Sequence, residues 1–321
     1  VPPEVVAADP FDALARAGDN RAVIQPADLY RPERANSKGW DIADRADMAA
    51  IDAARAPHET RAFKAAPLLA TDPKDGPTRA VLNPATGDTV GQVTDASDAD
   101  VEAALAAARP WDADAATRAR ILTRASDLYE ANFGEAFALL AREAGKTPDD
   151  AIAEMHEAVD FLRYYAARGQ DSDAPPRGIF TCISPWNFPL AIFTGQIAGA
   201  LAAGNGVLAK PAEATVLTAA WAVRLLHEAG VPRDVLQLIP GDGAIVGKRL
   251  TSDPRVKGVA FTGSTATAQS INRAMAAHLD PTAPLIAETG GLNAMIVDST
   301  ALPEQAVRDL ILSAFRSAGQ R

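Results

Sequence analysis

Five short polar segments hold the side chains of this sequence that could do chemistry. They cover residues 184–189, 210–213, 241–243, 261–265 and 288–291. The carboxamide of Asn187 can donate a hydrogen bond without carrying charge, which suits the stabilisation of a developing oxyanion. The carboxylate of Glu288 can take a proton from a water molecule. Each segment alone is a weak signal, because Asn187 could instead cap a helix that begins near Pro189.

Lys210 and Glu213 have the chemistry to hold the ribose of an adenosine. A carboxylate accepts hydrogen bonds from both ribose hydroxyls and repels a 2′-phosphate, so Glu213 favours NAD over NADP. The alternative is a surface ion pair of little energetic weight. Gly243 and Gly247 could let the backbone approach a pyrophosphate at a helix start, or they could simply allow close packing. The hydroxyl of Ser264 could reach a phosphate, cap the following helix, or do both.

Alternating strands and helices are expected to position these segments. Short apolar runs predict strands at 178–184, 207–210, 235–239, 256–261 and 285–288. Helical spacing of apolar residues predicts helices between them, at 190–203, 214–229, 242–252 and 265–279. This alternation indicates an α/β fold with a doubly wound, Rossmann-like parallel sheet that is covered on both faces. Ligands bind beyond the carboxyl ends of such strands, and the five polar segments fall at those ends.

The sequence before residue 176 is predicted to be mainly helical. Residues 1–75 are weakly patterned and are interpreted as a leader or linker that packs on another part, with a short helix near 45–56. Strands are expected at 80–83 and 89–93, around a turn at 85–87. Ser97 and Asp100 have the spacing of a capping box before a helix at 101–109. Further helices are predicted at 115–144 and 151–167.

Composition and charge narrow the classes of partner. The 321 residues carry a formal net charge of −10, which disfavours binding to nucleic acid or to an anionic membrane surface. The longest apolar stretch, 188–210, is interrupted by Gln196 and Asn205, so no transmembrane segment is expected. The first residues lack the pattern of a signal peptide, and a cytoplasmic location is the default expectation.

The single cysteine and the four histidines receive no chemical role. Cys182 lies inside the apolar run 178–184 without an adjacent histidine, so we predict a buried structural cysteine. The histidines are scattered and show no metal-ligand spacing, so no metal site is predicted.

Taken together, the order and spacing of the five segments resemble the aldehyde dehydrogenase superfamily across roughly residues 78–321. The resemblance implies that Asn187 stabilises the oxyanion and that Glu288 activates the water that hydrolyses a thioester. It implies an NAD-binding domain at 76–290, after the leader at 1–75, and the start of a catalytic domain at 291–321. It also implies that the cofactor is NAD, with contacts from Ile183, Ser184, Pro185, Trp186, Lys210, Ala212, Glu213, Gly243, Gly247, Phe261, Thr262, Gly263, Ser264, Thr289 and Gly290.

Four further segments, 28–30, 34–39, 153–165 and 287–294, resemble the proline utilization A family. That family fuses a proline dehydrogenase barrel to an L-glutamate γ-semialdehyde dehydrogenase. The resemblance implies oxidation of L-glutamate γ-semialdehyde, which is in equilibrium with pyrroline-5-carboxylate, by a homo-oligomer with a proline dehydrogenase module upstream. Glu157 is the candidate to hold the ammonium group of the substrate, and a plain surface charge is the alternative. Ala287 and Leu292, where many relatives have Leu and Lys, are interpreted as marks of this subfamily.

The last residues resemble the Gly-Gln-x-Cys motif that carries the nucleophile of the superfamily. Gly319 and Gln320 match, Arg321 fills the variable position, and a cysteine is expected next. The chain by itself is therefore expected to be an inactive piece of a working enzyme. Two alternatives remain open: another NAD-dependent aldehyde dehydrogenase, such as a succinate semialdehyde type, or a dinucleotide-binding domain without catalysis.

Overall fold

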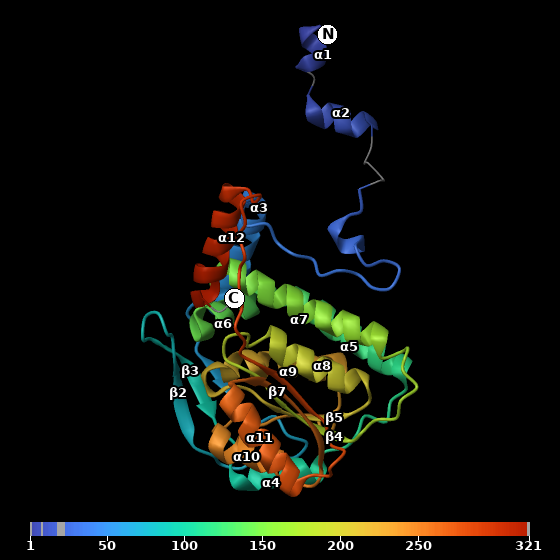
Figure 1. Ribbon diagram of the computed structural model, residues 1–321, viewed down its shortest axis with the longest axis vertical. Helices are drawn as coiled ribbons and strands as arrows, with labels where there is room; N and C mark the ends of the chain where they lie inside the picture. The colour runs from blue at the N-terminus through green and yellow to red at the C-terminus, as the bar shows by residue number, and fades with distance from the viewer. Residues whose placement is uncertain (1, 8, 18–22, 320–321) are drawn as a thin grey trace.

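A five-stranded parallel sheet forms the centre of the computed structural model, which describes residues 2–7, 9–17 and 23–319 (Figure 1). The strands lie in the order β6-β5-β4-β7-β8. Their bounds are β4 (Ile179–Ile183), β5 (Gly206–Lys210), β6 (Leu236–Leu238), β7 (Val256–Gly263) and β8 (Leu285–Thr289). In sequence order this is the arrangement 3-2-1-4-5, so the winding reverses between β4 and β7 and leaves a crevice at that point.

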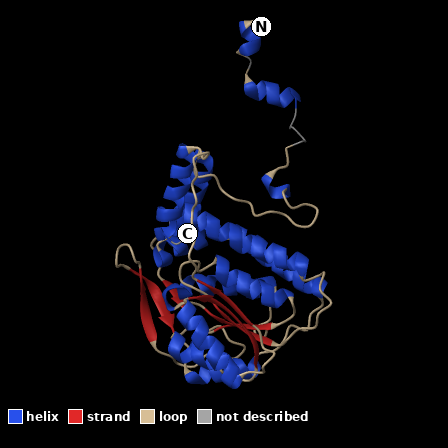
Figure 2. Ribbon diagram, viewed as in Figure 1, coloured by secondary structure: helices blue, strands red, loops and turns tan. Residues whose placement is uncertain are grey.

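Helices cover both faces of this sheet (Figure 2). The segments that connect its strands are α8 (Ala191–Ala202), the 3-10 turn η3 (Glu213–Thr215) with α9 (Val216–Ala229), the π-helical turn η4 (Gly243–Gly247) with α10 (Lys248–Thr251), and α11 (Thr265–His278). Side chains alternate along β4, so Phe180 and Cys182 join the core under α8 and α9, while Ile179 joins the core under α10 and α11. The predicted α/β fold and its five strands are confirmed.

A second layer of helices packs on α8 and α9. It consists of α5 (Ala115–Ala131), α6 (Phe133–Ala144) and α7 (Pro148–Arg168), while α4 (Asp98–Ala107) packs on the opposite face of the sheet. The capping box of Ser97 and Asp100 is confirmed at the start of α4. The single helix predicted at 115–144 is wrong, because the helix breaks at Asn132 and restarts in a new direction. Gly134 allows that turn of chain to lie against the backbone of Ala54, where a side chain would collide.

The N-terminal part contributes a small sheet and several short helices. They are α1 (Pro3–Val6), α2 (Pro10–Ala17), the 3-10 turns η1 (Pro26–Asp28) and η2 (Ala56–His58), α3 (Arg45–Arg55), β1 (Phe63–Ala65), β2 (Thr78–Leu82) and β3 (Thr89–Thr94). β3 pairs with β1 in parallel and with β2 antiparallel. The predicted leader is therefore tied to the body through β1, whereas α1 and α2 stand away from it (Figure 1).

The chain after β8 runs to α12 (Pro303–Phe315) and the 3-10 turn η5 (Arg316–Gly319). Leu292 and Ile296, between β8 and α12, are almost fully exposed, and α12 has no buried residue. Throughout the described residues, no helix is long and apolar enough to cross a membrane.

Glu143, near the end of α6, is a buried carboxylate that holds the start of α9. Its two oxygens accept hydrogen bonds from the backbone N–H groups of Leu217 and Thr218, each at 2.7 Å, and from the Thr218 hydroxyl at 2.6 Å. These donors satisfy backbone groups that a helix start leaves unpaired. Burial raises the pKa of the Glu143 carboxyl to about 7, although the bonds from Thr218 and Leu217 oppose that rise.

This raised pKa predicts that Glu143 makes the folding stability depend on pH. The folded protein binds the proton of Glu143 more tightly than the unfolded chain, whose carboxyl has a pKa of about 4.3. The stabilisation that the folded protein gains from the protonated Glu143 carboxyl is thus complete below about pH 4 and is lost as pH rises through 7. Between pH 5 and pH 8, the wild type should lose about 2–3 kcal/mol of unfolding free energy relative to Glu143→Gln, as measured by urea denaturation. Parallel pH profiles for the two proteins would contradict this assignment.

Candidate functional site

The register of the sheet brings the predicted segments to one edge. Ile183, at the end of β4, lies opposite Lys210 on one side and Phe261 on the other. One step further along, Thr262 of β7 lies opposite Glu288 of β8. Four parallel strands therefore end together, and the polar residues that follow them share the carboxyl edge of the sheet, as the sequence predicts.

Lys210 and Glu213 form one end of this edge. The Lys210 ammonium is buried and lies 3.1 Å from Oε1 of Glu213, whose side chain is half exposed. Burial opposes ionisation of Glu213, but the charge of Lys210 and a hydrogen bond from the Gly243 N–H outweigh it, so the pKa of this carboxyl is lowered. Glu213 is thus an ionised acceptor at the surface, with its position set by a buried cation.

Gly243 and Gly247 bring the backbone of η4 against this pair. A Cβ added to Gly243 would lie 3.5 Å from the Glu213 carboxylate, and one added to Gly247 would lie 3.6 Å from the Lys210 side chain. The side chain of Asp242 caps the turn by accepting from the N–H groups of Ala244 and Ile245. The two glycines therefore place backbone without side chains beside the Lys210–Glu213 pair, which is the surface that a nucleotide needs.

The other predicted cofactor contacts lie along the same edge. Ser184 is buried, Pro185, Ala212 and Gly263 are partly buried, and Trp186 is 54% exposed. Ser264 caps α11 by accepting from the N–H of Thr267 at 3.1 Å, so its predicted capping role is confirmed. Thr289 ends β8 and Gly290 follows it, and no atom beyond its chain neighbours lies within 4 Å of where a Cβ of Gly290 would stand.

Gln196 was not predicted, yet it bridges the crevice between β4 and β7. Its Nε2 donates to the backbone oxygen of Ile183 at 3.2 Å and to the hydroxyl of Thr262 at 3.1 Å. Together with Glu288 and the apolar side chain of Ile192, it lines a pocket of about 850 Å³. A polar residue in the otherwise apolar helix α8 was the signal that the sequence offered for it.

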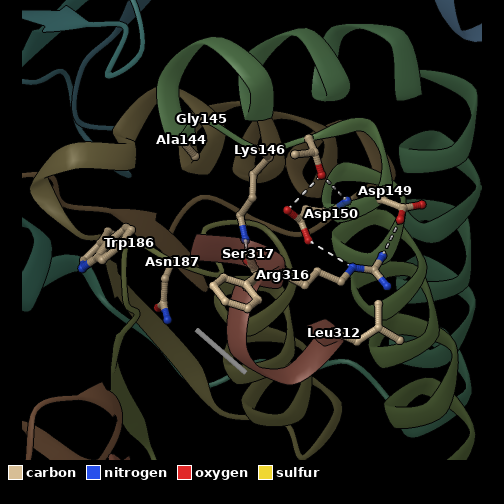
Figure 3. A pocket seen from close by; sticks show the side chains of 12 residues that line it. Ala144, Gly145, Lys146, Asp149, Asp150, Trp186, Asn187, Leu312, Arg316 and Ser317 are labelled. Atoms are coloured by element: carbon tan, nitrogen blue, oxygen red, sulfur yellow. Dashed lines mark hydrogen bonds and ion pairs between the residues drawn. The ribbon is translucent and has the colours of Figure 1, made fainter. Parts of the chain in front are cut away.

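Asn187 lines a different and smaller pocket, of about 330 Å³ (Figure 3). Its walls include Lys146, which follows α6, together with Phe315 and Ser317 at the C-terminal end of the chain. Helix α8 begins at Ala191, and its N-cap residue is Leu190, whose side chain provides no cap. The N–H groups of Leu190 and Ala191 instead donate to the carboxylate of Glu154 on α7.

Asn187 and Glu288 therefore lie at the same edge but do not line the same pocket. Ser317, two residues before the first residue of the motif that was predicted to carry a nucleophile, lines the pocket of Asn187. Gln320 and Arg321 of this motif lie outside the described residues.

Glu157 projects from the exposed face of α7 into a third pocket, of about 710 Å³. This pocket shares Asp149 and Arg316 with the pocket of Asn187, so the two adjoin. Its other wall includes Arg34 of the leader and Asp160 of α7, which form an ion pair at 2.7 Å.

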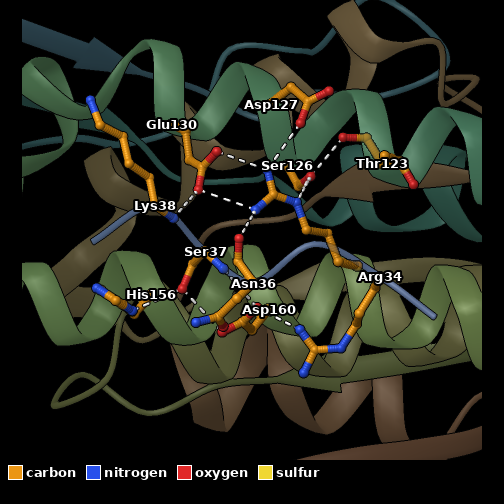
Figure 4. A network of polar contacts seen from close by, with 11 residues as sticks. Arg34, Asn36, Ser37, Lys38, Thr123, Ser126, Asp127, Glu130, His156 and Asp160 are labelled. Carbon is orange, nitrogen blue, oxygen red and sulfur yellow. Dashed lines mark hydrogen bonds and ion pairs between the residues drawn. The ribbon is translucent and has the colours of Figure 1, made fainter. Parts of the chain in front are cut away.

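A polar network fastens the leader to α7 at this wall (Figure 4). The hydroxyl of Ser37 lies 3.0 Å from Oδ2 of Asp160 and 2.8 Å from Nδ1 of His156. A carboxylate can only accept, so Ser37 donates its one hydrogen to Asp160 and Nδ1 of His156 donates to Ser37. Arg163 binds the backbone oxygen of Asn36 at 2.9 Å. The segment 34–39 is therefore bound to α7, the helix that carries Glu157.

Cys182 is not placed to act as a nucleophile. Its side chain is 1% exposed inside the core, and burial raises the pKa of its thiol to about 12. A thiol with that pKa forms almost no thiolate at neutral pH. Within the described residues there is also no group of three or more His, Cys, Asp or Glu side chains that could hold a metal ion.

The sequence of the chain is similar to those of known proteins. Residues 71–321 match the aldehyde dehydrogenase family. The chain is 49% identical to the bifunctional protein PutA of Klebsiella aerogenes, over all of this chain and 26% of that protein. It is 40% identical to the 1-pyrroline-5-carboxylate dehydrogenase of Anoxybacillus flavithermus, over 64% of this chain and 43% of that protein. The chain thus spans about a quarter of the length of the PutA relatives.

Solved structures share the fold. A mutant of proline utilization A from Bradyrhizobium japonicum superposes with a TM-score of 0.80 at 42% identity, over 97% of this chain and 31% of that one. The 1-pyrroline-5-carboxylate dehydrogenase from Thermus with bound NAD gives a TM-score of 0.83 at 32% identity, over 89% of this chain and 61% of that one.

The burial of Cys182 predicts that it is unreactive in the folded protein. A thiol reagent at pH 8 should label less than about a tenth of the native protein in the time that labels the urea-unfolded chain completely, because the reactive form is the thiolate. Labelling can be followed by intact mass. Equal labelling rates in the native and unfolded states would contradict the assignment of Cys182 as a core residue.

Proposed function

The chain belongs to the aldehyde dehydrogenase family, and from this premise we propose that it binds NAD and takes part in the oxidation of L-glutamate γ-semialdehyde to L-glutamate. The observation that carries the proposal is the convergence of Lys210, Glu213, Gly243 and Gly247 at the carboxyl edge of a doubly wound sheet. The bifunctional PutA relatives and the 1-pyrroline-5-carboxylate dehydrogenases support the choice of substrate.

NAD fits the residues at this edge. Glu213 is the proposed acceptor for the hydroxyls of the adenosine ribose, and Lys210 holds Glu213 in place at 3.1 Å. Gly243 and Gly247 have no side chain beside Glu213 and Lys210, so backbone borders the proposed place of the pyrophosphate. Ser264, at the N-terminus of α11, adds a hydroxyl and the positive end of a helix. When bound, NAD supplies the acceptor for the hydride that leaves the aldehyde carbon.

The proposed chemistry assigns one role to each pocket. The carboxamide of Asn187 donates to the oxyanion that forms when a thiolate attacks the aldehyde. The carboxylate of Glu288 takes a proton from the water that releases the acid product. Because Cys182 is buried, we place the thiol nucleophile outside the described residues. The carboxylate of Glu157, on the adjoining pocket, is the proposed partner for the substrate ammonium group.

We further propose that this activity belongs to a larger polypeptide. The PutA relatives are bifunctional and about four times longer than the matched part, which supports a proline dehydrogenase module joined to the dehydrogenase. We also propose a homo-oligomeric assembly. Within the chain, we propose a leader at 1–75, an NAD-binding domain at 76–290 and the start of a catalytic domain at 291–321.

Removing the Asn187 carboxamide tests the proposed reaction in the complete enzyme that carries this chain. Asn187→Ala should lower kcat for L-glutamate γ-semialdehyde by about 10²–10³, because one oxyanion donor is lost. The Kd for NAD, measured by calorimetry, should change less than about twofold, since Lys210 and Glu213 are untouched. An unchanged kcat would refute the oxyanion role and with it the proposed chemistry.

Removing the Glu213 carboxylate tests the proposed cofactor preference. Glu213→Ala should weaken NAD binding about tenfold and narrow the preference for NAD over NADP by at least about tenfold, because repulsion of the 2′-phosphate disappears. Glu228→Ala is the matched control, since this exposed carboxylate lies at the opposite end of the same connection. Equal effects of the two variants would argue against a ribose site at Glu213.

A further inference from the structure

A buried ion pair lies behind the pocket of Asn187. The Lys146 ammonium is 3.1 Å from Oε1 of Glu154, and their side chains are 7% and 1% exposed. Lys146 follows the left-handed Gly145 that ends α6, and Glu154 lies in the second turn of α7. Two charges withdrawn from water in this way are costly, and an apolar pair of similar volume is often as stable. Stability alone therefore gives a weak reason for this arrangement.

Glu154 holds the end of the loop that carries Asn187. Its second oxygen, Oε2, accepts hydrogen bonds from the N–H of Leu190 at 3.1 Å and from the N–H of Ala191 at 2.8 Å. These are the first backbone donors of α8, for which the N-cap residue provides no side-chain acceptor. The loop 184–189 is thus fixed at its downstream end by a carboxylate from another helix.

Lys146 reaches from the same ion pair toward the pocket itself (Figure 3). Its ammonium lies 4.5 Å from the ring centroid of Phe188, the residue after Asn187, in a cation–π contact. It also donates to the hydroxyl of Ser317 in η5 at 3.4 Å. One side chain therefore contacts both sides of the pocket, the Asn187 loop and the turn that faces it.

The cap of α9 by Glu143 can be compared with the cap of α8 by Glu154. It holds the start of α9 in the same manner, and every one of its hydrogen bonds comes from Leu217 or Thr218, without a lysine. Capping of α8 would thus need only Glu154. The lysine adds the contacts to Phe188 and Ser317, which lie at the pocket and not at the helix start.

We propose that Lys146 and Glu154 form a positioning pair, which sets the 184–189 loop, and with it the Asn187 carboxamide, at a fixed distance from η5. Glu154 anchors the loop to α7, and Lys146 transmits that anchor to Phe188 and Ser317. This inference rests on the proposed oxyanion role of Asn187 for its catalytic consequence, but the positioning itself is a property of the fold.

The test is the double variant Lys146→Met with Glu154→Gln. Lys146→Met alone would leave a buried carboxylate without its cation, which can prevent folding. In the double variant the Gln oxygen can still accept from Leu190 and Ala191, so the cap of α8 is kept. The melting temperature should therefore stay close to that of the wild type, while the contacts to Phe188 and Ser317 are lost.

Hydrogen exchange and kinetics of the double variant then test whether the pair positions the Asn187 loop. Amide exchange at 186–188 should accelerate about tenfold, and kcat of the complete enzyme should fall about tenfold or more, while the Kd for NAD changes less than about twofold. Glu143→Gln is the matched control. Both oxygens of Glu143 accept from α9, so the amide nitrogen of a Gln would face an N–H donor, and the substitution should loosen 217–218 but not 186–188. If the double variant keeps the wild-type exchange at 186–188, the positioning pair is refuted, whatever the activity.

The effects of Asn187→Ala and of the double variant on kcat separate the positioning role of Lys146 and Glu154 from the proposed reaction. If Asn187→Ala lowers kcat and the double variant does not, the pair does not position Asn187 and the proposed reaction stands. If Asn187→Ala leaves kcat unchanged while exchange at 186–188 accelerates in the double variant, the proposed reaction fails and the structural link between Lys146 and the loop stands.

Discussion

Burial of both faces of the parallel sheet confines its polar chemistry to the carboxyl edge. Helices cover β4, β5 and β7 on each side, so side chains within these three strands face two apolar cores, whereas the edge strand β8 is largely exposed. The alignment of Ile183 with Lys210 and Phe261 makes these strands end in one row. Lys210 stands in that row, and Glu213, Gly243 and Ser264 lie in the segments that follow it, so the proposed cofactor site gathers at this edge.

Buried glutamates hold the helices that start at this edge. Helices α8 and α9 begin directly after the segments with Asn187 and Glu213, and each start leaves backbone N–H groups unpaired. Glu154 and Glu143 supply the acceptors from the outer helix layer. The outer layer is therefore more than a cover for the sheet, because it determines where two of the site segments lie.

The sequence predicted the sheet and the strand-end segments because their signals are local. An apolar run bounded by Gly or Pro predicts a strand, and a polar motif after it predicts what lies at the edge. The break at Asn132 could not be read in this way, because it depends on close packing of Gly134 against Ala54, far away in the chain. The bonds of Glu154 and Gln196 likewise join distant elements, so the residue types were visible but their partners were not.

The Lys210–Glu213 pair and the backbone at Gly243 and Gly247 are proposed to hold the adenosine end of NAD. The most direct measurement is a crystal structure of the protein with NAD. The adenosine ribose should lie within hydrogen-bond distance of the Glu213 carboxylate, and the pyrophosphate should lie against the backbone near Gly243. A dinucleotide bound elsewhere, or a ribose that contacts neither Glu213 nor Lys210, would contradict this proposal.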